Sequence, residues 1–225
     1  MRQSSNNLQS TARQSSLDGI ADDDQLIKDE DQKALMEAAN GLQQFDEVLR
    51  IAEGAINTQQ FQLTPEMVKE LNRIAVQNIR RSAGQFRTVP ISITNTLHEP
   101  PPADEVPGHV TEMCNYVNQN WRKAGEDLQD AFHLAAYLMW RLNWIHPFRD
   151  GNGRTSRAVS YLVLTVRLGQ VLGGQPTIAD QIVDNKDPYY QALDDADAAW
   201  KEGRLDLGSM ENLLNRLLEN QLGSQ

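Results

Sequence analysis

Twelve consecutive residues, from His146 to Arg157, carry the side chains of this chain that are best suited to chemistry. They read His-Pro-Phe-Arg-Asp-Gly-Asn-Gly-Arg-Thr-Ser-Arg. An imidazole with its usual pKa of about 6.5 can accept a hydroxyl proton near neutral pH. A carboxylate is a hard oxygen ligand for Mg²⁺, and guanidinium groups bind phosphate oxygens. This combination predicts a site that holds a polyphosphate and attacks it.

The glycines of this motif add a second feature. Gly151, Asn152 and Gly153 come just before an expected helix. Glycines let backbone N–H groups converge on one point, and a helix N-terminus favours anions. Arg154 and Arg157 stand three residues apart, so a helix places both on one face. Phe148 is apolar among polar neighbours, so we expect it to pack into the core and fix the loop.

Composition restricts the function classes. The chain has 225 residues, a net charge of −10 and 40% hydrophobic residues. This acidic balance argues against nucleic-acid binding through general phosphate neutralisation. The sequence has no apolar run long enough for a membrane span, no secretory signal and no P-loop. A lone cysteine, Cys114, makes a zinc site or a disulfide improbable and is expected to be buried. We expect a cytoplasmic protein, with delivery into another cell as the alternative.

The surrounding pattern predicts the elements that position the motif. Residues 1–28 are rich in Ser, Gln, Asn and Asp, which predicts a disordered or flexible tail. Residues 29–225 are predicted to form one domain, with its core at about 45–220. Apolar residues with helical spacing predict seven helices. Four of them begin at about Asp29, after a Thr64 cap, at Val110 and within the glycine stretch. The other three span Leu128 to Trp144, about 188–200 and 210–222. On the first of these helices, Leu35 and Leu42 belong to the expected apolar stripe. Pro147 should end the helix that precedes the motif.

One segment departs from this helical pattern. Residues 88–94 alternate and are rich in β-branched side chains, which favours a short strand or hairpin. The predicted class is therefore all-α, with one small inserted β-hairpin.

The motif matches every fixed position of the Fic family signature, His-x-Phe-x-Asp/Glu-Gly-Asn-Gly-Arg-x-x-Arg, and the chain resembles that family over roughly residues 45–220. The resemblance implies a Fic-type helical bundle and a Mg²⁺-dependent protein adenylyltransferase. Such an enzyme moves AMP from ATP to a Ser, Thr or Tyr hydroxyl of a target protein. By position, the resemblance implies that His146 is the base and Asp150 the Mg²⁺ ligand. It implies phosphate contacts from Gly151, Asn152, Gly153, Arg154 and Arg157.

The resemblance also implies binding residues outside the motif. Residues 187–193 resemble the segment that flanks the adenine, which makes Tyr189 and Tyr190 candidate ATP contacts. The segment after Gly84-Gln85-Phe86-Arg87 resembles the family's flap, and His98 resembles part of its return. Such a flap binds the backbone of the target as an added strand. The flap residues expected here are Val89, Pro90, Ile91, Ser92 and Ile93.

Many relatives are held inactive by a helix carrying Ser/Thr-x-x-x-Glu-Gly/Asn, whose glutamate pairs with the second arginine of the motif. Two segments match this pattern in part, at residues 49–54 with Glu53 and at residues 215–220 with Glu219, the second being the better match. Two other interpretations stay open. Both glutamates can be solvated residues of amphipathic helices, or a separate antitoxin subunit supplies the inhibitory glutamate. An oligomeric protein is compatible with either interpretation.

Two other functions remain as alternatives. One keeps the fold but uses another nucleotide or a phosphate donor; the intact Gly-Asn-Gly-Arg counts against it. The other is a non-catalytic nucleotide-binding regulatory module. The complete set of expected catalytic residues counts against that alternative.

Overall fold

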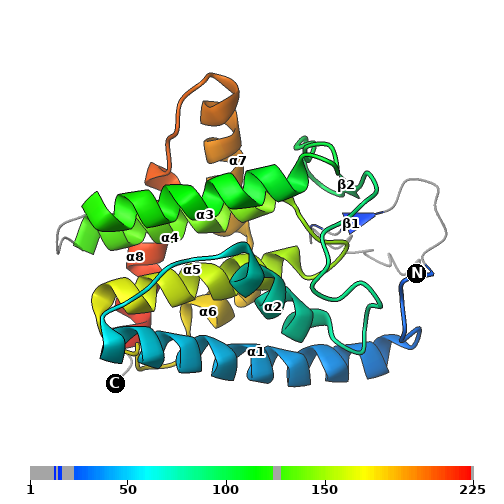
Figure 1. The fold of residues 1–225 in the computed structure, drawn as a ribbon, viewed down its shortest axis with the longest axis horizontal. Helices are drawn as coiled ribbons and strands as arrows, with labels where there is room; N and C mark the ends of the chain where they lie inside the picture. Colours follow the sequence, from blue (N-terminus) through cyan, green and yellow to red (C-terminus); the bar gives the residue numbers. More distant parts are fainter. Residues whose placement is uncertain (1–12, 14, 17–22, 124–127, 224–225) are drawn as a thin grey trace, which may run out of the picture.

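The computed structural model describes residues 13, 15–16, 23–123 and 128–223, in which the all-α class predicted from the sequence is confirmed (Figure 1). Within this part of the chain no helix is both long and apolar enough to cross a membrane. The elements in chain order are β1 (Ser15–Ser16), α1 (Glu30–Thr58), α2 (Pro65–Val76), β2 (Ser92–Ile93), α3 (Val106–Lys123), α4 (Leu128–Ile145), α5 (Asn152–Leu168), α6 (Ile178–Asp184), α7 (Asp187–Lys201) and α8 (Gly208–Gly223).

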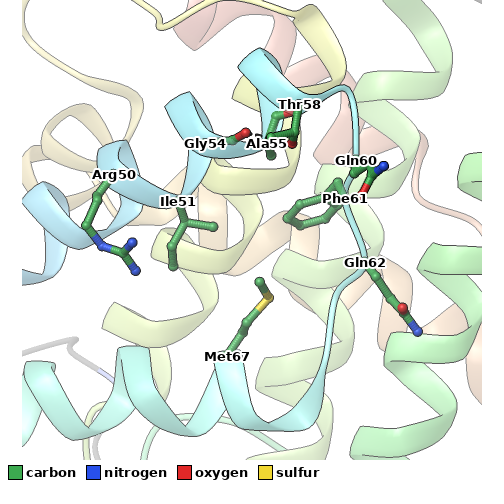
Figure 2. Close-up of a pocket in the computed structure, with 9 residues that line it drawn as sticks. All are labelled: Arg50, Ile51, Gly54, Ala55, Thr58, Gln60, Phe61, Gln62 and Met67. Atoms are coloured by element: carbon green, nitrogen blue, oxygen red, sulfur yellow. Dashed lines mark hydrogen bonds between the residues drawn. The ribbon is translucent and has the colours of Figure 1, made fainter.

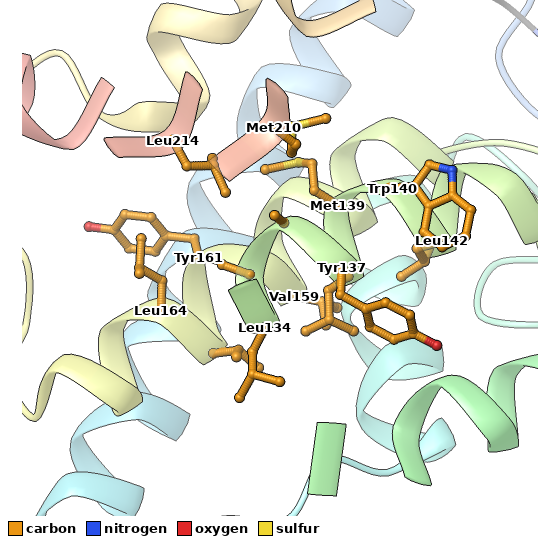
Figure 3. Close-up of a cluster of buried hydrophobic side chains, with 14 of the residues drawn as sticks. Leu134, Tyr137, Met139, Trp140, Leu142, Val159, Tyr161, Leu164, Met210 and Leu214 are labelled. Atoms are coloured by element: carbon orange, nitrogen blue, oxygen red, sulfur yellow. The ribbon is translucent and has the colours of Figure 1, made fainter. Parts of the chain in front are cut away.

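The antiparallel pair α4 and α5 forms the centre of the bundle. Helices α1 and α2 pack against α5, while α3, α7 and α8 pack against α4 (Figure 1). Figure 3 shows the core between α4, α5 and α8, where side chains such as Leu134, Val159 and Leu214 are almost fully buried. Each such side chain contributes about 1.5–3 kcal/mol relative to an exposed one. Cys114 of α3 is also buried, as predicted.

Local sequence signals explain where several helices begin and end. The Thr64 hydroxyl accepts a hydrogen bond of 3.3 Å from the Met67 N–H, and Pro65 is the first residue of α2, as predicted. Helix α4 ends at Ile145, two residues before Pro147. Helix α6 was not predicted, although its capping box of Thr177 and Asp180 is a recognisable start signal.

The buried face of α1 differs from the predicted stripe. Leu35 and Leu42 are 73% and 72% exposed, whereas Asn40 and Gln44 are buried. The Asn40 side chain donates to the carbonyl of Gln77 at 2.9 Å, and the Gln44 side chain donates to that of Leu71 at 2.8 Å. Backbone carbonyls of α2 and of the residue after it need hydrogen-bond donors when buried. The amides therefore face α2, and the two leucines point outward.

The flap region contains a strand of only two residues. Ser92 and Ile93 pair antiparallel with Ser15 and Ser16, about 77 residues earlier, and no local hairpin partner is present among the described residues (Figure 1). Pro90 has no N–H to donate, and Asn95 has a left-handed backbone (φ 58°) that ends the strand. Of the predicted tail, Arg13, residues 15–16 and residues 23–28 are placed, and its remaining residues lie outside the described part.

Candidate active site

The motif lies at a cavity of about 910 Å³. Ligand pockets for small molecules and cofactors typically enclose about 300–1,000 Å³. The lining brings together most of the predicted site residues: His146, Asp150, Gly151, Asn152, Gly153, Arg154 and Arg157 of the motif, Tyr189 and Tyr190 of α7, and Ile93 of β2. Residues far apart in the sequence thus meet at one place.

Other predicted residues are not part of this lining. Val89, Pro90, Ile91 and Ser92 precede Ile93 on the flap, and the Ile91 side chain is buried. Glu219 is exposed on α8 and accepts a hydrogen bond from Asn215 one turn earlier. Glu53 is exposed near the C-terminal end of α1, next to Gly54, which lines a different and smaller cavity (Figure 2). The structure therefore brings neither glutamate to the motif.

The backbone of His146 has an unusual conformation. Its φ is 49°, in the left-handed region that a residue with a Cβ rarely adopts. The residue is held there from both sides, because its N–H donates to the Leu142 carbonyl at 3.0 Å and its carbonyl accepts from Arg87 Nε at 2.8 Å. Strain of this kind persists only when neighbouring contacts enforce it. The turn aims the imidazole into the cavity rather than along α4.

The imidazole of His146 is set up as a neutral base. Its Nδ1 lies 3.3 Å from the Asn143 carbonyl, an acceptor, so Nδ1 carries the proton and Nε2 the lone pair. The side chain is buried, and desolvation lowers the pKa of His146 to about 3, with the charges of His98 and Arg87 acting in the same direction. An anionic ligand beside it would raise this pKa, which brings the base closer to its working range.

Asp150 is an ionised carboxylate at the start of the turn. Burial acts to raise its pKa, but Arg154 and Arg80 together keep the pKa below the usual value for aspartate. Oδ2 accepts from Arg80 Nε at 3.0 Å, while Oδ1 accepts from Arg154 at 3.1 Å and from the Gly151 N–H at 2.6 Å. Within the described residues, no cluster of three or more His, Cys, Asp or Glu side chains could hold a metal ion. A single carboxylate fits Mg²⁺ that arrives with substrate phosphates, because Mg²⁺ usually takes one or two carboxylates there.

The N-terminus of α5 faces the same cavity. Gly151 is the capping residue, it has a φ of 77°, and no side chain caps the helix. The first N–H groups of the helix therefore have no partner within it and can donate to an anion. A Cβ on Gly151 would lie 2.7 Å from Val76 Cγ1 of α2. Glycine is thus required at position 151 for both its conformation and its close contact with α2.

The Asn152 side chain is used to hold the loop. Its Oδ1 accepts from the Phe148 N–H at 2.9 Å, and its Nδ2 donates to the Phe148 carbonyl at 2.8 Å. Phe148 itself is buried against Phe86, with ring centroids 5.5 Å apart, as predicted. Asn152 therefore offers its backbone N–H, and not its amide, to a ligand.

The two arginines of the motif differ in their partners. Arg154 Nη2 lies 3.1 Å from Asp150 and 3.4 Å from Glu37 of α1, and its Nη1 donates to the Ala75 carbonyl. Arg157 forms no ion pair with any carboxylate of the described residues, although it is partly buried and desolvation lowers its pKa. A guanidinium stays charged even so. Arg157 is thus a cation at the cavity with no carboxylate to neutralise it.

The charge of the cavity is opposite to that of the whole chain, in which 31 acidic residues exceed 21 basic ones. Its basic lining consists of Arg13, Lys33, Arg80, Arg149, Arg154, Arg157 and Lys186, and its acidic lining of Glu30, Glu37, Asp150, Asp180 and Asp197. A local excess of cations in an acidic protein concentrates anionic ligands at this place.

Helix α7 forms the other wall of the cavity. The Tyr189 hydroxyl accepts from Asn143 at 2.8 Å, and burial raises the pKa of Tyr189. Tyr190 contacts the N-terminal segment: the Arg13 guanidinium lies 4.5 Å from its ring centroid, and the Arg13 N–H donates to its hydroxyl at 3.1 Å. The ring of Tyr190 is thus covered from outside the bundle.

Comparison with known proteins agrees with this geometry. Residues 62–164 match the sequence model of the Fic/DOC family. The part of the chain that carries the motif therefore matches the Fic/DOC family. A curated relative, the protein adenylyltransferase Fic of Nematostella vectensis, is 25% identical over 153 residues, which are 68% of this chain and 33% of the relative. The chain therefore spans about a third of the length of that relative.

Solved structures of Fic-domain proteins show the same fold. A Fic-domain signaling protein from Bacteroides thetaiotaomicron has a TM-score of 0.61 at 21% identity, covering 82% of this chain and 69% of that one. The BepC protein of Bartonella tribocorum, solved with bound AMPPNP, has a TM-score of 0.54 at 17% identity, covering 85% and 88%. At these identities the likeness concerns the fold alone.

Several residues that position the Fic/DOC motif had not been singled out from the sequence. The Asn72 side chain donates to the Asp150 carbonyl at 2.9 Å and accepts from the Gly84 N–H at 3.1 Å. Glu37 reaches Arg154 from α1. For Asn72, a polar residue within the apolar stripe of α2 is the signal that could have found it. Glu37 sits among ordinary helix charges, and nothing in its local sequence distinguishes it.

Proposed function

We propose that this protein is a Mg²⁺-dependent adenylyltransferase that moves AMP from ATP to a Ser, Thr or Tyr hydroxyl of a protein. The observation that carries the proposal is the meeting of a neutral His146 with the uncapped α5 N-terminus and the unneutralised Arg157 in one cavity. A base, anion donors and a phosphate-binding cation are what nucleotidyl transfer needs. The family and the curated relative named an adenylyltransferase support the same reaction.

Each residue then has a stated task. His146 Nε2 takes the proton of the target hydroxyl, and the deprotonated oxygen attacks the α-phosphorus. The N–H groups at the start of α5 stabilise the charge on the phosphate oxygens, as an anion hole does. Arg157 holds the outer phosphates through its planar fork of donors. The tyrosines of α7 line the same cavity, and we propose that they bind the adenine.

Asp150 would hold the metal ion in this scheme. Its carboxylate is ionised and lies beside the phosphate cradle, so the donor chemistry fits Mg²⁺. When bound, Mg²⁺ neutralises phosphate charge and orients the leaving group. Arg80 and Arg154 occupy both oxygens of Asp150 in this structure, so we propose that Arg154 moves from Asp150 to the phosphates when Mg²⁺ and ATP bind.

We further propose that Glu37 restrains this step. Its carboxylate lies 3.4 Å from Arg154 and competes with phosphate for that guanidinium. Neither Glu53 nor Glu219 lines the cavity, so Glu37 is the better-placed glutamate for control of the site by the chain itself. A target protein would bind along the flap that carries β2.

The test is intact-mass analysis after incubation with ATP and Mg²⁺, with a panel of candidate acceptor proteins. We expect one added AMP on an acceptor or on the protein itself, and loss of that adduct in His146→Ala. His133→Ala is the matched control, because His133 lies on α4, the helix that precedes His146, but its ring contacts Tyr116 and Glu211 and does not line the cavity.

The remaining outcomes separate the alternatives. Equal labelling of both variants would remove His146 from the mechanism. A phosphate adduct, or preference for another nucleotide in competition, would point to a different donor. Tight ATP binding without any adduct, for the wild type and for Glu37→Gln, would favour a nucleotide-binding regulatory module.

A further inference from the structure

His98 is a buried side chain in an exposed stretch of the flap. It lies five residues after Ile93, the last residue of β2, and its side chain is only 8% exposed. The preceding residue, Leu97, is 93% exposed. A polar ring is buried in this way when its nitrogens find hydrogen-bond partners, because an unpaired polar group loses its hydration. The partners of His98 therefore show where the return of the flap is attached.

Both ring nitrogens of His98 face hydrogen-bond acceptors. Nε2 lies 2.8 Å from the carbonyl oxygen of Trp144, and Nδ1 lies 3.3 Å from Oδ2 of Asp197. A neutral imidazole carries one N–H group, whereas the imidazolium carries two. Because neither a carbonyl nor an ionised carboxylate can donate, both contacts are hydrogen bonds only when the ring is protonated. The geometry is therefore that of a charged His98.

Asp197 of α7 is suited to this pairing. Its side chain is 13% exposed, and its Oδ1 accepts from Trp140 Nε1 at 2.7 Å, which leaves Oδ2 for His98. Burial raises the pKa of Asp197, whereas the charge of His98 and the Trp140 hydrogen bond act to lower it. Removing one partner of a buried ion pair leaves the other charge uncompensated. Loss of the His98 proton would therefore weaken the attachment of the flap to α7.

The two ends of the flap are attached to consecutive carbonyls at the end of α4. At the start of the flap, Arg87 donates to the carbonyls of Ile145 at 3.3 Å and of His146 at 2.8 Å. At its return, His98 donates to the carbonyl of Trp144. The last carbonyls of a helix have no donors within it and favour cations. Two cationic side chains therefore hold the flap to the turn that aims the His146 imidazole.

We propose that the protonated His98 is a positioning residue for AMP transfer, an inference that rests on the proposed function. His98 keeps the return of the flap on α4 and α7, so that a target strand along β2 presents its hydroxyl to His146. When His98 loses its proton, one of its two hydrogen bonds is lost and the flap is released from α7. Transfer to a target then slows as the pH rises, while ATP binding persists.

The charged and titratable groups that face His98 and its two acceptors come from α3, α4 and α7. They are His109 of α3, Arg141 of α4, His146 after α4, and Asp194, Asp197 and Lys201 of α7. Of these groups, Asp197 is the one paired with the His98 ring. Substitution of Asp197 is therefore the most direct way to change the charge that His98 meets.

Amide hydrogen exchange of the full chain tests this clamp without any substrate. The protection of residues 92–98 is measured by NMR at pH 5 and pH 8, relative to an unfolded peptide at the same pH. We expect His98→Gln to lower this protection at least about tenfold at pH 5, because the neutral amide lacks the charge that pairs with Asp197. Protection should fall between pH 5 and pH 8 in the wild type and stay constant in His98→Gln.

His133→Gln is the matched control for this measurement. The His133 ring also pairs with a carboxylate, because its Nδ1 lies 2.8 Å from Glu211, but it does not line the cavity. We expect the protection of residues 92–98 in this variant to equal that of the wild type at both pH values.

Kinetics of Asp197→Asn and His98→Gln give a second readout. Asparagine keeps an acceptor for Trp140 but removes the charge that pairs with His98. With the acceptor protein that the panel identifies, both variants should lower kcat/KM for the acceptor at least about tenfold and change the Kd for ATP less than about twofold. The alkaline limb of the pH profile should move to lower pH by about one unit or more in Asp197→Asn, and it should be absent in His98→Gln.

Other results would overturn the assignment in distinguishable ways. Unchanged flap protection in His98→Gln would show that His98 does not hold the flap. A parallel rise in the Kd for ATP would place His98 in nucleotide binding, and an unchanged pH profile would remove its ionisation from the reaction. Absence of AMP transfer by the wild type would overturn the proposed function, and the exchange data would then still decide whether the clamp exists.

Discussion

Arg87 Nε donates a hydrogen bond of 2.8 Å to the carbonyl oxygen of His146. The same guanidinium donates to the Pro101 carbonyl at 2.5 Å, and the Arg87 N–H donates to the Pro147 carbonyl at 2.8 Å. One buried side chain therefore connects the base of the flap to the end of α4. It also holds the left-handed turn that aims the imidazole.

Arg87→Lys is expected to separate positioning from nucleotide binding. Lysine keeps the charge but lacks the fork of donors, so His146 loses one of its restraints. The kcat of AMP transfer should fall at least about tenfold while the Kd for ATP changes less than about twofold. Single-turnover kinetics and calorimetric titration measure the two quantities. Arg73→Lys, on the exposed face of α2, is the control, and a parallel loss of ATP binding would mean that the site has collapsed.

Gly151→Ala should destabilise the fold through two separable effects. A Cβ in the left-handed region costs about 1–2 kcal/mol, and the contact of 2.7 Å with Val76 adds about 1–3 kcal/mol. Gly203→Ala is a matched control, because Gly203 also has a φ of 77° but has open space around the site of its Cβ. Urea unfolding should therefore show a larger loss for Gly151→Ala. Equal losses would mean that the contact with α2 is absent.

His146 should show no titration near neutral pH in the free protein. Its pKa is lowered to about 3, so the imidazole resonances observed by NMR should stay constant between pH 5 and 8. The unfolded chain binds a proton at this histidine below its usual pKa of about 6.5, while the folded protein does not. This group therefore lowers the free energy of unfolding by about 1.4 kcal/mol per pH unit as the pH falls from about 6.5 toward 3.

His146→Gln isolates that contribution. Glutamine does not titrate, so the stability of the variant should fall less steeply with decreasing pH than that of the wild type. Parallel slopes for the two proteins, measured by urea unfolding at several pH values, would contradict the low pKa of His146.

Arg157→Ala should weaken ATP binding more than the loss of an ordinary, partly exposed arginine would. Its guanidinium has no carboxylate partner in the described part of the chain, so its whole charge is available to phosphate. We expect the Kd for ATP to rise about 10- to 100-fold, as for the loss of a charge-assisted hydrogen bond. Arg204→Ala, in an exposed pair with Glu202, should leave the Kd unchanged.

Glu37→Gln should tighten ATP binding. The substitution removes a negative charge beside the phosphate site and frees Arg154 from one of its partners. We expect the Kd for ATP to fall about 3- to 10-fold, since the competing pair is partly exposed and screened. Glu53→Gln and Glu219→Gln test the two glutamates predicted from the sequence. A lower Kd in either of these variants, with none in Glu37→Gln, would reverse the assignment.

The sequence was sufficient for the class of fold and for the motif, because both depend on local signals. Helical spacing, the Thr64 cap and the proline after α4 each act within a few residues. The φ of His146 could not be read this way, since a residue before proline is normally pushed toward extended backbone. Its conformation depends on Arg87, 59 residues earlier. The contacts of Glu37 and Arg13 likewise arise only when distant elements pack together.

The outward position of Leu35 and Leu42 was also beyond sequence reasoning. Periodicity favoured these leucines as the buried stripe, but the residues that face α2 are Asn40 and Gln44, which donate to the carbonyls of Gln77 and Leu71. The orientation of α1 therefore depends on backbone carbonyls of α2 and of the residue after it, which accept hydrogen bonds from α1.

The burial of Asn40 and Gln44 in place of Leu35 and Leu42 has a consequence for turnover. The first half of α1 lines the cavity through Glu30, Lys33, Ala34, Glu37 and Ala38, whereas its apolar burial by Val48, Ala52 and Ala55 is confined to the second half. Water can replace amide hydrogen bonds at a small net cost, but it cannot replace buried methyl groups. Moving the first half of α1 away from the cavity should therefore cost less free energy than separating α4 from α5. In the proposed reaction, we expect pyrophosphate to leave along this half of α1.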